Sequence, residues 1–584
     1  MAQFSARPGT RHGLPSDFKL GRAFAALLPG LLVLGYAVFC VHQALTENLV
    51  GPHRWDDFKY INRALTGKFD FHIRFRYAHV WGLRAFFELI EERRLAAAAY
   101  GAAMNGGLVL AAYALGARAR GAVVGILGAL LLSAFLPLAM FSSTPLCDPP
   151  CTLYASAALL CALRSRDAGA SLVWAVLCGF LGFASLKSKE TGIAVMPVLL
   201  WLLAARSAAP CPARKHPVLY AALGLLAGQV VLCVVDGLLS GDFLQSLRLS
   251  GYHKYVTAVR SLPRGPSATG RLLDRKEWME LLFEPGVREY AVAGSLGMVV
   301  GFRRSLVIRA MGLWTVFNLL FGSWVCFRYT GIDAHVRYLG PFAPALCVGS
   351  AYLLDRLLRL PGALSESDDA GSGPGGGLQP LSPWLSWLVI LACLGLSGWG
   401  LYYGWRAYVD ESPAFLVERG ARFLFPLALP LSLVAAALVR PRAVRAVFLG
   451  LCLFALLLVG QKETHEYFAR ERREVNQWGK LAKAVAAMPE PKVALFHVVK
   501  PSIKPQLIRW RIAGLSEVAF ESIRVREVDQ AKDAHPDEIL LVNYHRRKVR
   551  KLERRKVPSA EWRSFVRVPL DRRRARAYRY VGPK

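Results

Sequence analysis

The sequence has few acidic residues for its number of basic ones. It contains 41 Asp and Glu against 73 Lys and Arg, which gives a formal net charge of +32 and a pI of about 10.0. Such an excess usually indicates a nucleic-acid partner. Here the cations lie in loops and in a C-terminal tail, between long apolar runs. The pattern therefore favours anionic lipid headgroups or phosphates, and no nucleic-acid partner is expected.

The sequence also lacks the cysteine and histidine spacing that holds a structural zinc ion. Most of the 11 cysteines stand singly inside apolar segments, where they act as small hydrophobic residues. Cys147 and Cys151 bracket a short Asp-Pro-Pro loop, and two free thiols are favoured there over a disulfide. No metal site and no cofactor is predicted, although a role for a divalent cation stays open.

A cleavable signal peptide is not indicated. The first apolar run, at about 23–45, is too long for the core of such a peptide, and no small-residue cleavage site follows it. Basic residues precede the run. We therefore expect a retained first membrane span with a cytoplasmic N-terminus.

Long apolar runs are what the chain has most of. Hydrophobic residues make up 54% of it, and its mean hydropathy is +0.32. We predict an all-α polytopic membrane protein with about 13 transmembrane helices. The predicted spans lie near 23–45, 95–116, 121–141, 150–163, 169–186, 191–205, 218–240, 289–302, 305–326, 338–357, 384–403, 421–439 and 446–461. Arginines recur in the loops that this count places inside, as the positive-inside rule requires.

The chain divides into four predicted parts. Residues 1–360 form a transmembrane module with outer loops, and 361–383 form a glycine-rich cytoplasmic linker. Residues 384–461 supply the last membrane helices. The tail, 462–584, is predicted to be a small α/β domain outside the membrane. Its signals are an amphipathic helix at 464–488 and strands at Val493–Val499, Glu538–Val542 and Ser564–Val568.

Several charged groups collect where the topology places the outer membrane face. Asp56 and Asp57 follow the first span, in a basic and aromatic loop, and Asp148 follows the third. Short outer loops are usually poor in Lys and Arg. Two of them carry such residues here, namely 187–192 and 328–338. Cations held there are candidates for binding an anion. The loop from 46 to 94 also contains an expected interfacial helix at 81–89, and His72 and His79, which we expect at the surface.

The ordered set of these motifs resembles the GT-C glycosyltransferases. The set comprises an acidic pair after the first span, an Asp after the third, a Ser-Lys-Glu-Thr-Gly turn after the fifth, and Arg-Tyr-Leu-Gly-Pro-Phe at 337–342. The protein O-mannosyltransferases and the lipid A aminoarabinose transferases are the most similar branches. Family members usually have Asp-Glu where this chain has Asp-Asp.

The resemblance implies transfer of a sugar from a polyprenyl-phosphate carrier, with inversion, to lipid A, another glycolipid, a glycan or a protein. It places the chain in the bacterial inner membrane, with the reaction and the C-terminal domain on the periplasmic side. Asp56 or Asp57 would be the base, with Asp56 slightly favoured. The expected phosphate-binding residues are Lys187, Lys189, Arg328 and Arg337, and the expected supporting residues are Glu190, Asp148, Tyr60, His53 and Tyr338.

Two other functions stay open. An O-antigen ligase or polymerase would use its large late periplasmic loop, here at about 241–288, which is rich in basic residues. That function gives no role to the early Asp pair. A lipid flippase or transporter would place charge near the membrane midplane, often in repeated halves. Asp236 lies near the end of its span, and the sequence shows no internal repeat.

Overall fold

The computed structural model describes the parts of the chain on which the following account is built. They are residues 16–46, 55–67, 76–167, 171–205, 216–244, 287–323, 336–358, 449–450, 453, 457, 473, 475–497, 505–516, 522–528, 533–544, 562–570 and 573–581.

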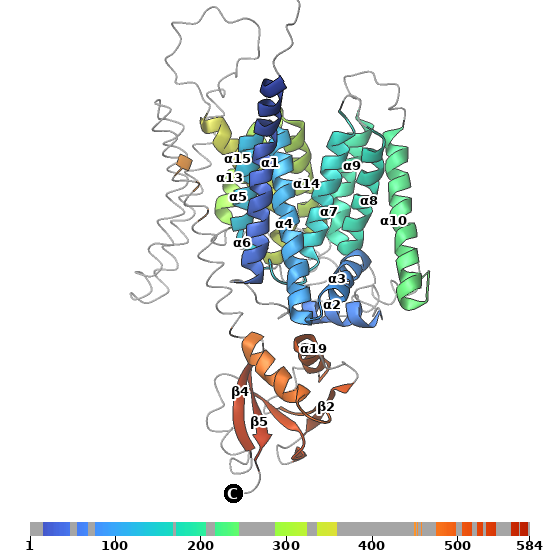
Figure 1. The fold of residues 1–584 in the computed structure, drawn as a ribbon, viewed down its shortest axis with the longest axis vertical. Coiled ribbons are helices and arrows are strands. Elements are labelled where there is room, and N and C mark those ends of the chain that lie inside the picture. The colour runs from blue at the N-terminus through green and yellow to red at the C-terminus, as the bar shows by residue number, and fades with distance from the viewer. Residues whose placement is uncertain are drawn as a thin grey trace, which may run out of the picture.

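A bundle of membrane helices forms the larger part of the molecule (Figure 1). Each of the first ten predicted spans overlaps one of its helices. They are α1 (Ser16–Leu45), α4 (Arg93–Arg120), α5 (Ala122–Ala134), α7 (Asp148–Arg164), α8 (Val173–Ser188), α9 (Met196–Ala204), α10 (Pro217–Ser240), α13 (Arg288–Gly301), α14 (Leu306–Ser323) and α15 (Ala343–Leu358). Among the described residues, three helices are long and apolar enough to cross a membrane, within α1, α4 and α10. The chain is a multi-pass membrane protein.

The last part of the predicted topology is not tested by these helices. The spans at 384–403 and 421–439 lie outside the described residues, and 446–461 is described only at isolated positions. The total of about 13 spans and the boundaries of the four predicted parts therefore stay predictions.

Three of the predicted spans are interrupted by irregular backbone. α5 ends before Phe135, which has extended backbone angles, and the short helix α6 (Leu136–Ala139) follows with a proline in its first turn. The 3-10 segment η2 (Glu190–Val195) precedes α9, and η6 (Val336–Phe342) precedes α15. η2 packs against α7 and α14, while η6 packs against α6 and α7. Irregular backbone at membrane depth is tolerated where protein buries it.

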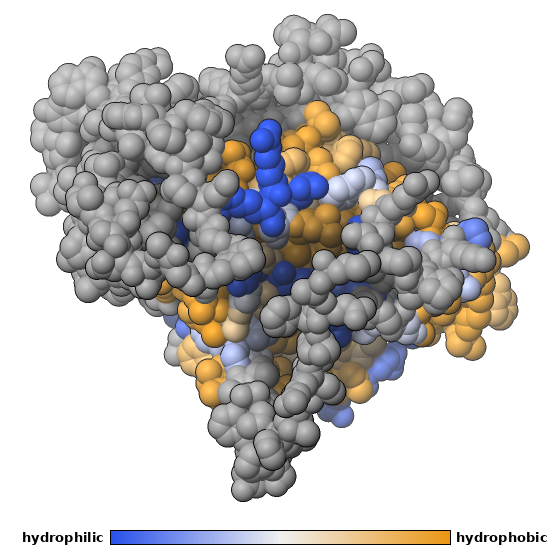
Figure 2. All heavy atoms as spheres, turned by 90° about the horizontal axis from the view of Figure 1, so that it is seen from above, coloured by the Kyte–Doolittle hydropathy of each residue, from blue (hydrophilic) through white to orange (hydrophobic). Residues whose placement is uncertain are grey.

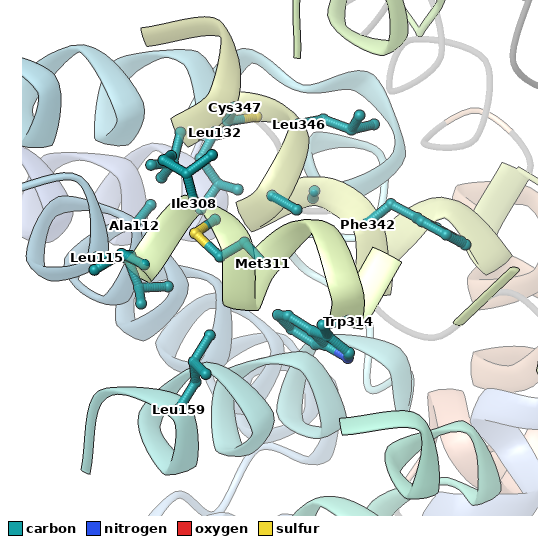
Figure 3. Packing of buried hydrophobic residues seen from close by; sticks show 14 of the residues in the cluster. Ala112, Leu115, Leu132, Leu159, Ile308, Met311, Trp314, Phe342, Leu346 and Cys347 are labelled. Carbon is teal, nitrogen blue, oxygen red and sulfur yellow. The ribbon is translucent and has the colours of Figure 1, made fainter. Parts of the chain in front are cut away.

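Close helix contacts hold the bundle together. A Cβ atom on Gly179 would collide with the carbonyl of Ala221, and one on Gly297 would collide with the carbonyl of Gly349. α8 therefore packs closely on α10, and α13 on α15, as small residues allow in membranes. The central apolar cluster surrounds Trp314, which is 2% exposed (Figure 3). Seen from the end of the bundle opposite the C-terminal domain, hydrophobic side chains cover much of the described surface (Figure 2).

Two short helices lie at the end of the bundle that is nearer the C-terminal domain (Figure 1). α3 (Tyr77–Leu89) confirms the helix expected at 81–89 and extends it by four residues at its start. α2 (Trp55–Thr66) corrects the sequence prediction, which placed a loop at the Asp pair. Four of its six buried residues, Asp57, Tyr60, Ile61 and Ala64, recur at helical spacing and share one face, and the other two are Phe58 and Arg63.

The C-terminal residues form the expected α/β unit, a sheet with strand order β2-β1-β3-β5-β4. β1 (Lys492–His497) is parallel to β2 (Arg524–Val528) and β3 (Ile539–Tyr544), whereas β5 (Arg573–Tyr580) is antiparallel to β3 and β4 (Trp562–Leu570). α19 (Pro505–Leu515) and the helix at 475–486 bury apolar residues against the sheet. β1, β3 and β4 match the predicted strands. β2 and β5 were not predicted, because charged residues obscure their alternation.

Candidate active site

A buried ion pair lies where α7 begins and α8 ends. The ammonium of Lys189 contacts Oδ1 of Asp148, and the two side chains are only 6% and 3% exposed. A buried charge is tolerated when an opposite charge and hydrogen bonds compensate it. The pair joins two loops that are far apart in the sequence and that the predicted topology placed at the same membrane face.

The backbone explains how Lys189 reaches this position. α8 stops at Lys189, which is extended with φ −158° and ψ 148°, while its N–H still bonds the Ser185 carbonyl at 3.1 Å. Gly192 then packs so closely on Ser185 that a Cβ atom would lie 2.5 Å from the Ser185 backbone. The turn therefore requires glycine, and it folds η2 back over the end of α8.

Asp148 is not the N-cap of α7. Cys147 is the N-cap of α7, and no side-chain capping hydrogen bond is made there. Asp148 is the first helical residue, and two prolines follow it, as the first turn of a helix favours. Its carboxylate instead meets Lys189 and the Cys147 thiol, 3.8 Å away.

A second ion pair stands beside the first. Arg76, just before α3, lies 3.5 Å from the Glu190 carboxylate. Its guanidinium also lies 5.5 Å from the centroid of the Tyr60 ring, within cation–π distance. Glu190, one of the expected supporting residues, thus forms an ion pair with Arg76. In the sequence, Arg76 is distinguished by nothing from the other basic residues of the loop.

Tyr60 links α2 to the first ion pair. Its hydroxyl lies 3.3 Å from the Cys147 sulfur, and Cys147 contacts Asp148 in turn. Burial raises the pKa of the Cys147 thiol to about 12, so this thiol stays protonated at neutral pH and can donate to the carboxylate. Cys147 and Cys151 are both free thiols, as predicted.

His79 is buried, which corrects the prediction of a surface residue. Its Nδ1 is 3.0 Å from the Tyr100 hydroxyl, and its ring meets the Tyr60 ring edge-on at 4.5 Å. Burial, with the nearby charge of Arg76, lowers the pKa of His79 to about 3. The imidazole is therefore neutral under physiological conditions and serves as a packing and hydrogen-bonding group.

The acidic pair lies on α2. Asp57 is fully buried and shares one face of the helix with Tyr60, three residues further on. Side chains at this spacing are neighbours, so Asp57 lies beside the residue that contacts Cys147. Asp56 is also in α2, but its side chain lies outside the described residues.

Comparisons with known proteins identify the fold that carries these residues. Residues 77–233 match the family model described as dolichyl-phosphate-mannose-protein mannosyltransferase. ArnT from Cupriavidus metallidurans bound to undecaprenyl phosphate is similar in structure, with a TM-score of 0.55 and 15% identity over 95% of this chain and 99% of that chain. The apo state of the same ArnT gives a TM-score of 0.54, also at 15% identity over 95% of this chain and 99% of that chain. The chain has the GT-C fold.

The resemblance drawn from the sequence is thus confirmed at the level of the fold. An oligosaccharyltransferase from Archaeoglobus fulgidus is more distant, with a TM-score of 0.46 and 11% identity over 88% of this chain and 69% of that chain. No curated protein matches the sequence.

Within this GT-C fold, the other predicted phosphate-binding residues are placed less favourably or are not described. Lys187 belongs to the last turn of α8, just before the turn that brings Lys189 to Asp148. Its ammonium nitrogen lies 5.4 Å from the centroid of the Phe183 ring. Arg328 and His53 lie outside the described residues. Arg337 and Tyr338 belong to η6, but their side chains are not described. η6 does border the site, because a Cβ on Gly340 would lie 3.7 Å from the Asp148 side chain.

A separate cavity of about 510 Å³ lies between α1, α4 and α5. Hydroxyl and amide groups line it, among them Tyr36, Gln43, Asn105 and Ser133. Charged side chains are absent from the described residues that form its wall. Because a phosphate requires cations or many N–H donors, this cavity is not the predicted phosphate site.

Proposed function

We propose that this GT-C chain transfers a sugar from a polyprenyl-phosphate donor to an acceptor hydroxyl. The observation that carries the proposal is the buried Lys189–Asp148 pair with Arg76–Glu190 beside it. Both pairs lie next to α2, the helix with the two aspartates. The fold adds support, since the similar ArnT structure is bound to undecaprenyl phosphate.

The acceptor's proton requires a base, and the α2 aspartates are the proposed candidates. A hydroxyl is a poor nucleophile, and a carboxylate within hydrogen-bond reach removes its proton as it attacks. The sequence slightly favoured Asp56. The helix favours Asp57, because Asp57 shares a face with Tyr60 and so borders the Cys147–Asp148 contact.

The leaving phosphate requires fixed positive charge. Lys189 is our first candidate, and we add Arg76, whose side chain is 19% exposed and can reach a bound anion while it keeps Glu190 as a neighbour. Arg328 and Arg337 stay in the proposal. Lys187 is a weaker candidate than the sequence made it, because its ammonium lies over the Phe183 ring.

The reaction is a single displacement at the anomeric carbon. The acceptor oxygen forms a bond to that carbon, its proton moves to the aspartate, and the bond from carbon to the phosphate oxygen breaks. The phosphate leaves with the electron pair and is already ionised, so it needs no general acid. Fixed cations stabilise the charge that develops on it. The configuration of the sugar is inverted.

We place the reaction at the periplasmic face of the bacterial inner membrane, with the C-terminal domain on that side. The basis is the predicted topology together with the position of α2, α3 and the domain at one end of the bundle (Figure 1). Lipid A, another glycolipid, a glycan and a protein all remain candidate acceptors.

The test is sugar transfer by the purified full-length protein in detergent. A radiolabelled polyprenyl-phosphate-sugar pool is incubated with cell-envelope acceptors and with wild type, Asp56→Asn or Asp57→Asn. Glu88→Gln is the matched control, because Glu88 is an acidic residue whose side chain is 68% exposed on α3. Transfer by wild type and the control that one Asn variant loses supports the proposal. Absence of transfer with the lipid still bound points to an O-antigen ligase or to a flippase.

A further inference from the structure

An arginine at the start of α4 makes polar contact between the membrane bundle and the C-terminal domain. Arg93 is the first residue of α4, and its Nη1 donates to the carbonyls of Ala513 at 3.4 Å and Ser516 at 3.3 Å. These carbonyls lie in the last turn of α19 and just beyond it. The last carbonyls of a helix have no partner within the helix and carry partial negative charge, so a cation there is favourable. Arg93 thus caps a helix of the other domain.

An apolar contact lies near the same boundary. Val475, in the C-terminal part of the chain, is 2% exposed and packs against Met140 and Leu515. Met140 follows α6 in the segment that leads to Asp148, and Leu515 is the last residue of α19. The domain therefore touches the bundle at α4 and at the chain segment that carries one half of the buried ion pair.

α19 also packs directly against α2, the helix that carries Asp56 and Asp57. α2 has 12 residues and packs against α3 on the bundle side. Helices of this length are only marginally stable by themselves in water and depend on tertiary packing. α19 therefore supplies part of the packing that keeps α2 in a defined position.

We propose that the C-terminal domain is a positioning element for α2, docked on the bundle through Arg93 and α19. Catalysis by a base requires that its carboxylate be held within hydrogen-bond reach of the acceptor. Undocking the domain loosens α2 and moves the carboxylate, while the cations near Asp148 keep their places. The proposal rests on the proposed function for its effect on turnover, but the effect on α2 itself does not depend on it.

The experiment compares Arg93→Met, Arg93→Lys and wild type in the full-length protein. Met keeps the length of the apolar part of the side chain and removes the guanidinium N–H groups that donate to Ala513 and Ser516. Arg84→Met is the control, because Arg84 is a basic residue of α3 that forms an ion pair with the exposed Glu88. Three quantities are measured. They are hydrogen exchange of the α2 backbone without substrate, the rate of sugar transfer, and the affinity for undecaprenyl phosphate.

We expect Arg93→Met to raise the rate of amide hydrogen exchange in residues 55–66 by about tenfold or more. The exchange rate in residues 100–115 of α4 should not change. Turnover should fall by about tenfold or more, with less than about a twofold change in affinity for undecaprenyl phosphate. Arg93→Lys should recover much of the α2 protection and much of the turnover. Arg84→Met should resemble wild type in all three measurements. If Arg93→Met fails to fold, Leu515→Ser tests the same boundary from the α19 side.

Unchanged α2 exchange in Arg93→Met overturns the proposal, whether or not turnover falls, because Arg93 would then act by another route. Faster α2 exchange with full turnover also overturns it. Faster α2 exchange in a protein whose wild type transfers no sugar leaves the docking role intact and refutes the proposed function instead. The two failures are therefore distinguishable.

Discussion

Lys189 and Asp148 form a buried ion pair that joins the end of α8 to the start of α7. The two residues are separated by 41 positions in the sequence. Around this pair stand Arg76 with Glu190, and Tyr60 through the Cys147 thiol. The functional predictions below depend on this arrangement.

The first prediction concerns the acidic pair. Asp57→Asn is expected to reduce sugar transfer by about 100-fold or more, as loss of a general base does. Binding of undecaprenyl phosphate should be retained, because the cations are untouched. Turnover and lipid binding are measured on the same preparation. Full activity in both single Asn variants would rule out the assignment of the base to this pair.

The second prediction separates structure from chemistry at the ion pair. Lys189→Met leaves the Asp148 carboxylate buried without its cation, which is expected to cost about 3–5 kcal/mol of stability. The double variant Lys189→Met with Asp148→Leu should regain much of that stability but not activity. Thermal unfolding and turnover are compared for both. An active double variant would show that the pair serves folding alone.

The third prediction concerns Arg76. Removing one charged hydrogen-bond donor costs about 1.5–3 kcal/mol, so Arg76→Met should weaken undecaprenyl-phosphate binding by about 10- to 100-fold. The affinity of Arg76→Lys should lie between those of wild type and Arg76→Met, since Lys keeps the positive charge but not the planar guanidinium with its paired donors. Arg84→Met is the control, because Arg84 is a basic residue of α3 that pairs with the exposed Glu88. Wild-type affinity in Arg76→Met would remove this residue from the donor site.

The fourth prediction is a pH dependence of stability. The pKa of His79 is lowered to about 3 in the folded protein by burial and by Arg76, whereas an unfolded histidine titrates near about 6.5. The unfolded chain therefore binds the proton first as pH falls, and stability declines below about pH 6.5. Between pH 7 and pH 5 the loss from this group is about 2 kcal/mol.

Substitution His79→Gln tests that dependence, because glutamine does not titrate and can still bond to Tyr100. Thermal unfolding of wild type and variant is followed from pH 7.5 to pH 4.5. The difference between the two curves should shrink or reverse as the pH falls. A difference that is constant with pH would show that the pKa of His79 is the same in the folded and the unfolded protein, which contradicts the prediction.

The fifth prediction concerns metal dependence. Fixed cations such as Lys189 and Arg76 can neutralise the leaving phosphate, so chelation should leave sugar transfer unchanged. Turnover is measured with and without chelator, and then with added Mg²⁺ or Mn²⁺. Loss of activity that a divalent ion restores would contradict the prediction.

Much of the fold followed from patterns along the chain. Long apolar runs predicted ten of the helices, because the bilayer requires about 20 apolar residues in a spanning helix. Alternation predicted β1, β3 and β4. It failed at β5, where arginines alternate with small and aromatic residues. The break between α5 and α6 was also missed, because a continuous apolar run does not reveal where its backbone bends.

The sequence alone determined that the chain is a multi-pass membrane protein, and it predicted that the loops holding Asp148 and Lys189 reach the same membrane face. Loop order and span length decide that much. The tertiary structure decided which partners those residues take. Lys187 and Lys189 are two positions apart in sequence and equivalent in chemistry, yet only Lys189 meets Asp148, because α8 ends in an extended residue there. Such a choice depends on where the backbone turns in three dimensions, and local composition does not encode it.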